Sequence, residues 1–187
     1  MIQSAKKLVK SLLRLLLTPL RAYNHHSNGV CDHRQRKEIP NDILLTAVKE
    51  AIREGHTATI IVRGWSMRPF LEHERDKVLL EGAPRYDIGD AVLAEIRPGH
   101  YVLHRIIEIH GDTVTLMGDG NIKGTETCRL ADICGVVRQY IRPRRTISAD
   151  DPALKRKIRI WRKLLPLRRI LLLIYGGAVG GCEVMRL

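Results

Sequence analysis

The feature that most constrains the fold is a series of short segments rich in β-branched residues, between residues 57 and 141. The segments that have strand-like composition are 57–62, 77–80, 91–96, 101–109, 113–117 and 133–141. Turn-forming pairs such as Gly89-Asp90, Pro98-Gly99 and Gly111-Asp112 separate them. Because no helical period lies between these segments, the sequence predicts a mainly β fold, with a coiled antiparallel sheet or partial barrel rather than a parallel α/β fold.

Amphipathic helices are expected on both sides of this β series. Asn41 or Asp42 can cap a helix after Pro40, and apolar residues at helical spacing follow until Gly55. A second helix is predicted to begin at Asp150-Asp151-Pro152, where an acidic cap precedes a proline at the first helical position.

The charge is distributed unevenly along the 187 residues, whose formal net charge is +12. Residues 1–37 carry a net charge of +7, residues 38–140 a net charge of −4 and residues 141–187 a net charge of +9. The length suits one hydrophobic core. We therefore predict a basic amphipathic N-terminal segment and linker (1–37), a central domain (38–147) and a basic amphipathic C-terminal tail (148–187).

Both basic ends are predicted to contact an anionic membrane surface. The N-terminal segment 2–20 is Leu-rich but interrupted by Lys and Arg, and the apolar run 170–182 is short and rich in glycine, so neither is expected to span a bilayer. Trp161 and the neighbouring leucines are expected to insert into the interface. This predicts a peripheral membrane protein; the side of the membrane stays open, with the cytoplasmic side favoured.

The cysteines do not indicate a metal centre or a disulfide framework. Four cysteines are scattered over the chain, and the interval between Cys128 and Cys134 is wider than the tight pairs of zinc sites. We expect no metal and no cofactor.

Ser66 is the candidate nucleophile. It stands in Gly64-Trp65-Ser66-Met67-Arg68-Pro69, directly after a predicted strand, where the chain has to turn. A serine at a strand end can present its hydroxyl from a rigid base, as a nucleophile requires. Taken alone, the same serine would be explained as an ordinary turn residue.

Two further motifs follow Ser66 in order. They are Tyr101-Val102-Leu103-His104-Arg105-Ile106-Ile107 and Gly118-Asp119-Gly120-Asn121. Together with Gly-x-Ser-Met-x-Pro, and with Gly89-Asp90-Ala91-Val92 between them, they resemble the signal peptidase and LexA-like superfamily of serine peptidases over roughly residues 57–140. The resemblance implies that superfamily's coiled β fold.

The resemblance also implies roles for the site residues. His104 stands where most bacterial members carry a lysine, as in the endoplasmic-reticulum-type, archaeal and spore-former signal peptidases. By that resemblance Ser66 attacks the scissile carbonyl, His104 accepts its proton and Asp119 supports the imidazole. Histidine suits this task near pH 7.

Three residues of the serine motif are assigned to the oxyanion and substrate-binding region. Gly64 stands where many signal peptidases have Ser or Thr, so the oxyanion would rest on the Ser66 backbone amide and a second main-chain donor. Met67 is expected to pack beneath the site, and Pro69 ends the turn.

The function expected from these features is a serine endopeptidase that cleaves a signal or leader peptide, bound as an added strand. One alternative is a LexA-like DNA-binding regulator, but the predicted helix 41–54 carries a net charge of −1, which does not suit DNA. A nucleic-acid partner is therefore not favoured. The other alternative is a catalytically silent, membrane-associated β-module.

Overall fold

A computed structural model describes residues 41–178 of the chain. The predictions for the N-terminal segment 1–37 and for residues 179–187 lie outside this described part, as do Cys31 and Cys182.

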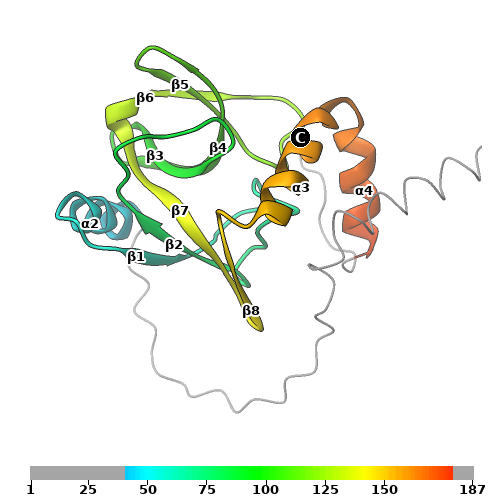
Figure 1. Ribbon diagram of the computed structural model, residues 1–187, viewed down its shortest axis with the longest axis horizontal. Helices are drawn as coiled ribbons and strands as arrows, with labels where there is room; N and C mark the ends of the chain where they lie inside the picture. Colours follow the sequence, from blue (N-terminus) through cyan, green and yellow to red (C-terminus); the bar gives the residue numbers. More distant parts are fainter. Residues whose placement is uncertain (1–40, 179–187) are drawn as a thin grey trace, which may run out of the picture.

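The described part is mainly β, as predicted from the sequence. An antiparallel sheet of eight strands, which does not close on itself, forms its centre (Figure 1). The strands are β1 (Ala58–Ile61), β2 (Lys77–Glu81), β3 (Ala91–Arg97), β4 (His100–His110), β5 (Thr113–Met117), β6 (Glu126–Arg129), β7 (Ile133–Arg142) and β8 (Arg145–Ser148). Their order across the sheet is β1-β2-β7-β3-β4-β5-β6, and β8 also pairs with β7.

Two of these strands were not predicted from the sequence. The short segments β6 and β8 contain charged and hydroxyl side chains and little apolar alternation. They are strands because each pairs its backbone with a stronger neighbour, β6 with β5 and β8 with β7.

Helix α2 (Asn41–Arg53) confirms the first predicted helix. Its buried residues Val48 and Ile52 face the sheet. A methyl group built on Gly135 of β7 would lie 2.8 Å from Cδ1 of Ile52, so glycine at this position lets the helix approach the strand closely.

The C-terminal region begins as predicted but packs differently from the prediction. Helix α3 (Pro152–Lys163) starts at Asp151, whose side chain accepts hydrogen bonds from the N–H groups of Ala153 and Leu154. A 3-10 turn, η2 (Leu165–Leu167), follows, and then helix α4 (Arg168–Ala178). These elements lie at the opposite end of the sheet from α2 (Figure 1).

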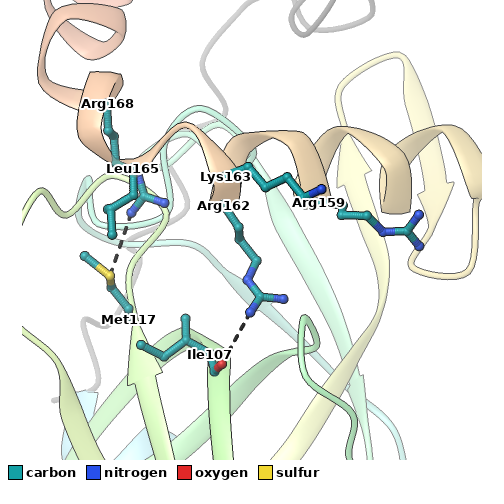
Figure 2. A pocket seen from close by; sticks show the side chains of 7 residues that line it. All are labelled: Ile107, Met117, Arg159, Arg162, Lys163, Leu165 and Arg168. Carbon is teal, nitrogen blue, oxygen red and sulfur yellow. Dashed lines mark hydrogen bonds between the residues drawn. The ribbon is translucent and has the colours of Figure 1, made fainter.

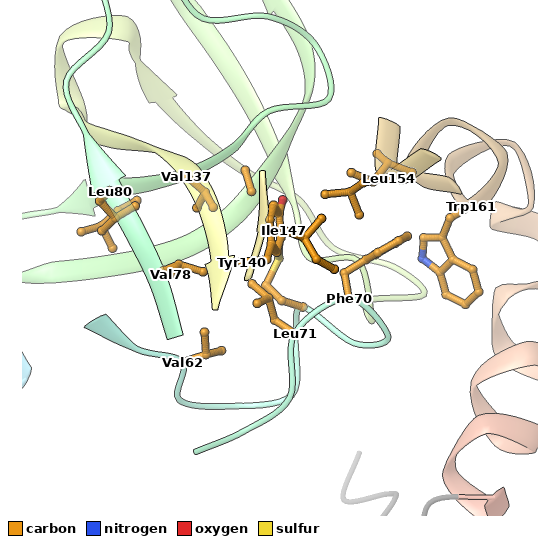
Figure 3. Packing of buried hydrophobic residues seen from close by; sticks show 14 of the residues in the cluster. Val62, Phe70, Leu71, Val78, Leu80, Val137, Tyr140, Ile147, Leu154 and Trp161 are labelled. Carbon is orange, nitrogen blue, oxygen red and sulfur yellow. The ribbon is translucent and has the colours of Figure 1, made fainter. Parts of the chain in front are cut away.

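The prediction that Trp161 inserts into a membrane is wrong. Its side chain is only 1% exposed and packs edge-on against Phe70, with the ring centroids 6.3 Å apart (Figure 3). Leu154 and Ile158 are buried in the same core. The apolar face of α3 therefore covers the sheet, because burial there removes its apolar surface from water. Residues 152–178 consequently belong to the folded unit.

Candidate functional site

Ser66 lies in an irregular segment between β1 and β2. The segment is closed at its base, where Val62 N–H donates to the carbonyl of Asp76 (2.9 Å) and Glu74 N–H donates to the carbonyl of Val62 (2.8 Å). Ser66 is half-buried. The serine thus sits on a loop whose two ends are fixed to each other.

The other predicted residues of this motif shape the loop. Gly64 has a φ of +88°, a backbone conformation that favours glycine, and its N–H donates to Nδ1 of His73 (3.0 Å). Met67 is 2% exposed and packs in the main core, where it forms the apolar floor of the loop. Pro69 is buried and follows a cis peptide bond.

The turn 118–121 packs directly on the backbone of Ser66. Gly120 N–H donates to the carbonyl oxygen of Ser66 at 2.7 Å. A methyl group built on Gly118 would lie 2.5 Å from this same oxygen, and one built on Gly120 would lie 2.8 Å from the carbonyl of Trp65. Only glycine permits so close an approach. Two motifs that are more than fifty residues apart in sequence are therefore in contact.

His104 lies in the middle of β4, beside the point where β5 leads into the turn 118–121. The next residue on the strand, Arg105, pairs with Met117, which directly precedes the turn 118–121. The His104 side chain is buried, and its Nδ1 forms a hydrogen bond with Oε2 of Glu126 at 2.9 Å. The turn 118–121 therefore joins all three motifs of the resemblance, because it contacts the Ser66 backbone and binds Arg105, the neighbour of His104.

The carboxylate that contacts His104 is therefore Glu126, which the sequence analysis did not identify. Pairing across the strands explains the contact. Ile106 of β4 lies opposite Leu116 of β5, which lies opposite Glu126 of β6, and His104 shares a face with Ile106. Strand β6 was itself missed, so its sequence gave no sign that Glu126 faces His104.

Asp119 does not occupy the place predicted for it beside His104. Its two carboxylate oxygens accept hydrogen bonds from Nε of Arg105 at 2.8 and 3.1 Å, and Nη2 of Arg105 adds a third. Both side chains are almost fully buried. Burial disfavours the charged guanidinium, but the Asp119 carboxylate outweighs this and raises the pKa of Arg105. Asp119 thus neutralises a buried arginine and fixes the turn 118–121.

Two hydrogen-bond donors of Ser66 have no partner in the described part of the chain. Within residues 41–178, neither the hydroxyl group nor the backbone N–H of Ser66 has a hydrogen-bond partner, so Ser66 and His104 are not hydrogen-bonded to each other. Catalytic hydrogen bonds are often long in ligand-free enzymes and shorten once substrate binds. With Nδ1 of His104 donating to Glu126, Nε2 is the basic nitrogen that can accept a proton.

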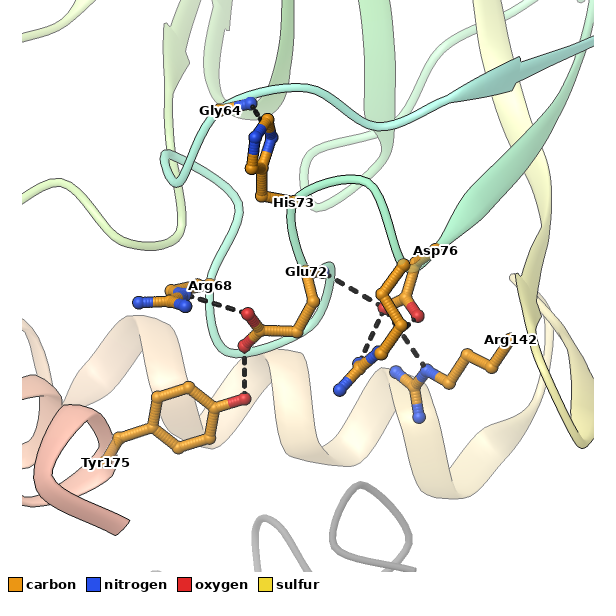
Figure 4. Close-up of polar contacts among 8 residues, drawn as sticks. Gly64, Arg68, Glu72, His73, Asp76, Arg142 and Tyr175 are labelled. Atoms are coloured by element: carbon orange, nitrogen blue, oxygen red, sulfur yellow. Dashed lines mark hydrogen bonds and ion pairs between the residues drawn. The ribbon is translucent and has the colours of Figure 1, made fainter. Parts of the chain in front are cut away.

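The C-terminal helices form hydrogen bonds with the two segments that meet at Ser66. The indole N–H of Trp161 donates to the carbonyl of Asp119 (2.8 Å), and Nη1 of Arg168 donates to the carbonyl of Asn121 (2.8 Å). On the serine loop, Tyr175 of α4 donates to Glu72, which also binds Nε of Arg68 at 2.9 Å (Figure 4). Helices α3 and α4 therefore fasten both segments that meet at Ser66.

This arrangement predicts the effect of Trp161→Phe. The substitution keeps an aromatic ring in the core but leaves the carbonyl of Asp119 without its donor, which costs about 1–3 kcal/mol of unfolding free energy. Because the turn 118–121 supports Ser66, the turnover number of the peptide hydrolysis expected from the sequence should fall by about tenfold, with little change in KM. Urea denaturation and steady-state peptide hydrolysis measure the two effects.

The matched control is Tyr86→Phe. It also removes one polar atom from a partly buried aromatic ring, and the Tyr86 hydroxyl has no hydrogen-bond partner within residues 41–178. If Tyr86→Phe lowers the turnover number as much as Trp161→Phe does, the indole hydrogen bond does not position the site.

The buried thiols of Cys128 and Cys134 are poor candidates for a nucleophile. Burial raises the pKa of both Cys128 and Cys134 to about 11, so these thiols stay protonated at neutral pH. In the described residues, no group of three His, Cys, Asp or Glu side chains is arranged to hold a metal ion.

Neither a scan against protein-family models nor a search of the curated proteins gives a match to this chain.

Proposed function

We propose that the protein is a serine endopeptidase that resembles signal peptidases, with Ser66 as nucleophile and His104 as general base. The observation that carries this proposal is that the turn 118–121 joins the serine motif and the His104-Arg105 motif. The turn 118–121 contacts the Ser66 backbone, and His104 forms a hydrogen bond with the carboxylate of Glu126. The open antiparallel sheet would then be the coiled sheet of the LexA and signal peptidase type.

The proposed mechanism uses the chain's own groups alone. The Oγ of Ser66 attacks the scissile carbonyl while Nε2 of His104 accepts the hydroxyl proton. Glu126 stabilises the imidazolium that forms, and the free N–H of Ser66 donates to the oxyanion. His104 then passes its proton to the leaving amine, and a water molecule, deprotonated by His104, hydrolyses the acyl-enzyme.

The proposed substrate is an extended peptide. Strand β1 is at an edge of the described sheet and leads directly into the Ser66 loop, and its residue Ile61 is 44% exposed. An extended peptide can add to such an edge through backbone hydrogen bonds. Preference for small side chains before the scissile bond, as in signal or leader peptides, rests on the resemblance alone.

Helix α2 is poorly suited to the DNA-binding alternative. Lys49 of α2 forms an ion pair with Glu95, and the apolar side of α2 is packed against the sheet. A basic side chain that is already neutralised contributes less to binding a phosphate backbone.

Covalent labelling tests the proposed function. The full chain is incubated with a fluorophosphonate probe and with a library of extended peptides, and mass spectrometry identifies the labelled residue and the cleaved bonds. We expect the adduct on Ser66, and loss of both labelling and cleavage in His104→Ala. A protein that neither reacts nor cleaves would be the catalytically silent β-module, and an adduct elsewhere would refute the assignment of Ser66.

Glu126→Gln tests the contact that the structure adds to the site. The amide keeps the size of the side chain but no longer stabilises the imidazolium, so we expect the turnover number to fall by about 10²-fold or more, with KM little changed. Glu108→Gln is the matched control, because Glu108 forms a similar hydrogen bond with His110 on the same strand, at the surface. Equal effects of the two substitutions would contradict a role for Glu126 in catalysis.

A further inference from the structure

A basic pocket lies on the side of the molecule formed by the C-terminal helices. Its volume is about 360 Å³. Residues from β4, β5, α3, η2 and α4 line it: Ile107, Met117, Arg159, Arg162, Lys163, Leu165 and Arg168 (Figure 2). Four of these seven side chains are basic and none is acidic. The pocket therefore favours an anion.

Arg168 gives the pocket a buried positive charge that is incompletely satisfied. The residue is 4% exposed, and its Nε has no hydrogen-bond partner among the described residues. Burial lowers the pKa of Arg168, as does the charge of Arg105, although Asp119 acts in the opposite direction. The Asp119 carboxylate is already bound by Arg105, so it does not serve Arg168 as a dedicated partner. An anion bound in the pocket would supply the missing negative charge.

An exposed apolar patch lies next to this pocket. Four residues form it, and all are more than one third exposed: Leu165, Leu167, Ile170 and Leu173. Leu167, Ile170 and Leu173 are spaced three residues apart, so they follow one face of the chain, while Leu171 and Tyr175 of the same helix are buried. Soluble surfaces rarely gather apolar side chains in this way without a partner.

The charge around the patch indicates the chemistry of that partner. Residues 152–178 contain eight basic side chains and no acidic one. Apolar side chains beside an excess of lysine and arginine are typical of surfaces that lie on anionic bilayers.

We propose that the surface formed by α3, η2 and α4 docks on a membrane that contains anionic phospholipid. The phosphate of one headgroup enters the basic pocket, and the patch of Leu165, Leu167, Ile170 and Leu173 inserts between the lipids. Helix α4 has 11 residues and is about 16 Å long, shorter than the hydrocarbon core of about 30 Å. None of the helices within residues 41–178 is long and apolar enough to cross a bilayer. In the proposed docking, α4 lies in the plane of the interface.

Trp161 thus stays buried in the core, and the exposed side of α3, η2 and α4 contacts the membrane instead. Membrane docking does not depend on the proposed peptidase activity, because neither Ser66 nor His104 takes part in it.

The test measures binding of the full chain to vesicles by co-sedimentation. Vesicles of equal parts phosphatidylcholine and phosphatidylglycerol are compared with vesicles of phosphatidylcholine alone. We expect binding to the anionic vesicles that weakens as salt is added. The variant R159E/K163E reverses two exposed charges at the pocket and should weaken binding by about thirtyfold or more. Leu167→Ser combined with Ile170→Ser should weaken it by about tenfold or more.

The matched control is R53E/R85E. It makes the same change in net charge at two exposed arginines that belong neither to the pocket nor to the apolar patch, and we expect it to bind within about threefold of the wild type.

Four results would overturn the proposal. The first is that R159E/K163E binds the anionic vesicles as tightly as the wild type does, which would place the membrane contact elsewhere in the chain. The second is an equal loss in R53E/R85E, which would show dependence on net charge alone. The third is that Leu167→Ser combined with Ile170→Ser lowers the unfolding free energy but does not weaken binding to the anionic vesicles. That result would mean that another protein segment covers the patch. The fourth is that the full chain binds a duplex oligonucleotide but does not bind the anionic vesicles.

Discussion

Replacement of Ser66 by alanine is expected to abolish peptide hydrolysis, with a fall in turnover of at least about 10⁴-fold, because no other group in the proposed mechanism can form the acyl-enzyme. The unfolding free energy should change by no more than about 0.5 kcal/mol. The Ser66 hydroxyl has no hydrogen-bond partner within residues 41–178, so its removal breaks no contact there. Fluorogenic peptide hydrolysis and urea denaturation give the two values.

Ser148→Ala is the control for this substitution. Ser148 is the other serine of the described part, and its hydroxyl accepts a hydrogen bond from the N–H of Asp150, far from the candidate site in the sequence. Activity should survive in this variant. Hydrolysis by Ser66→Ala at more than a few per cent of the wild-type rate, in a preparation free of host peptidases, would exclude Ser66 as the nucleophile.

Replacement of Asp119 by asparagine is expected to have the largest effect on stability. The substitution removes the negative charge from a pair in which both side chains are at most 2% exposed, and leaves the Arg105 guanidinium buried without its counter-ion. Breaking a buried ion pair in this way costs about 3–5 kcal/mol of unfolding free energy. The midpoint of urea denaturation should fall accordingly, with activity lost as the protein unfolds.

Asp112→Asn provides the comparison, since Asp112 is exposed in the turn between β4 and β5. We expect its unfolding free energy to stay within about 0.5 kcal/mol of the wild type. A different result for Asp119→Asn would support the prediction from the sequence that Asp119 assists His104. If Asp119→Asn keeps wild-type stability but loses turnover, its carboxylate acts on the chemistry and not only on the fold.

The local pattern of the sequence was sufficient for most of the secondary structure. Short segments rich in β-branched residues, separated by Gly89-Asp90 and Gly111-Asp112, predicted the long strands, because such side chains pack well on the pleated surface of a sheet. Asp151 before Pro152 predicted the start of α3, because a cap acts on the first turn of its own helix. The short strands β6 and β8 were not predicted, because their formation depends on pairing with the strands beside them.

The candidate site likewise has residues that the sequence predicts and contacts that only the tertiary structure shows. Ser66 and His104 are proposed from their residue type and motif, so the sequence alone was sufficient to select both as candidates. The carboxylate beside His104 depends on pairing across β4, β5 and β6, so only the tertiary structure showed that it is Glu126 and that Asp119 binds Arg105.

The C-terminal region shows most clearly what the sequence determined by itself. Its composition specified a basic amphipathic helix with apolar residues, but not what those residues would cover, because a sheet and a membrane satisfy the same hydrophobic requirement. The tertiary structure decided that Trp161 is buried on the sheet and that Ile170 stays exposed. The physical reason is that the folded domain offers Trp161 both an apolar contact at Phe70, in the serine loop, and a hydrogen-bond acceptor at Asp119, in the turn 118–121, which a bilayer core would not supply.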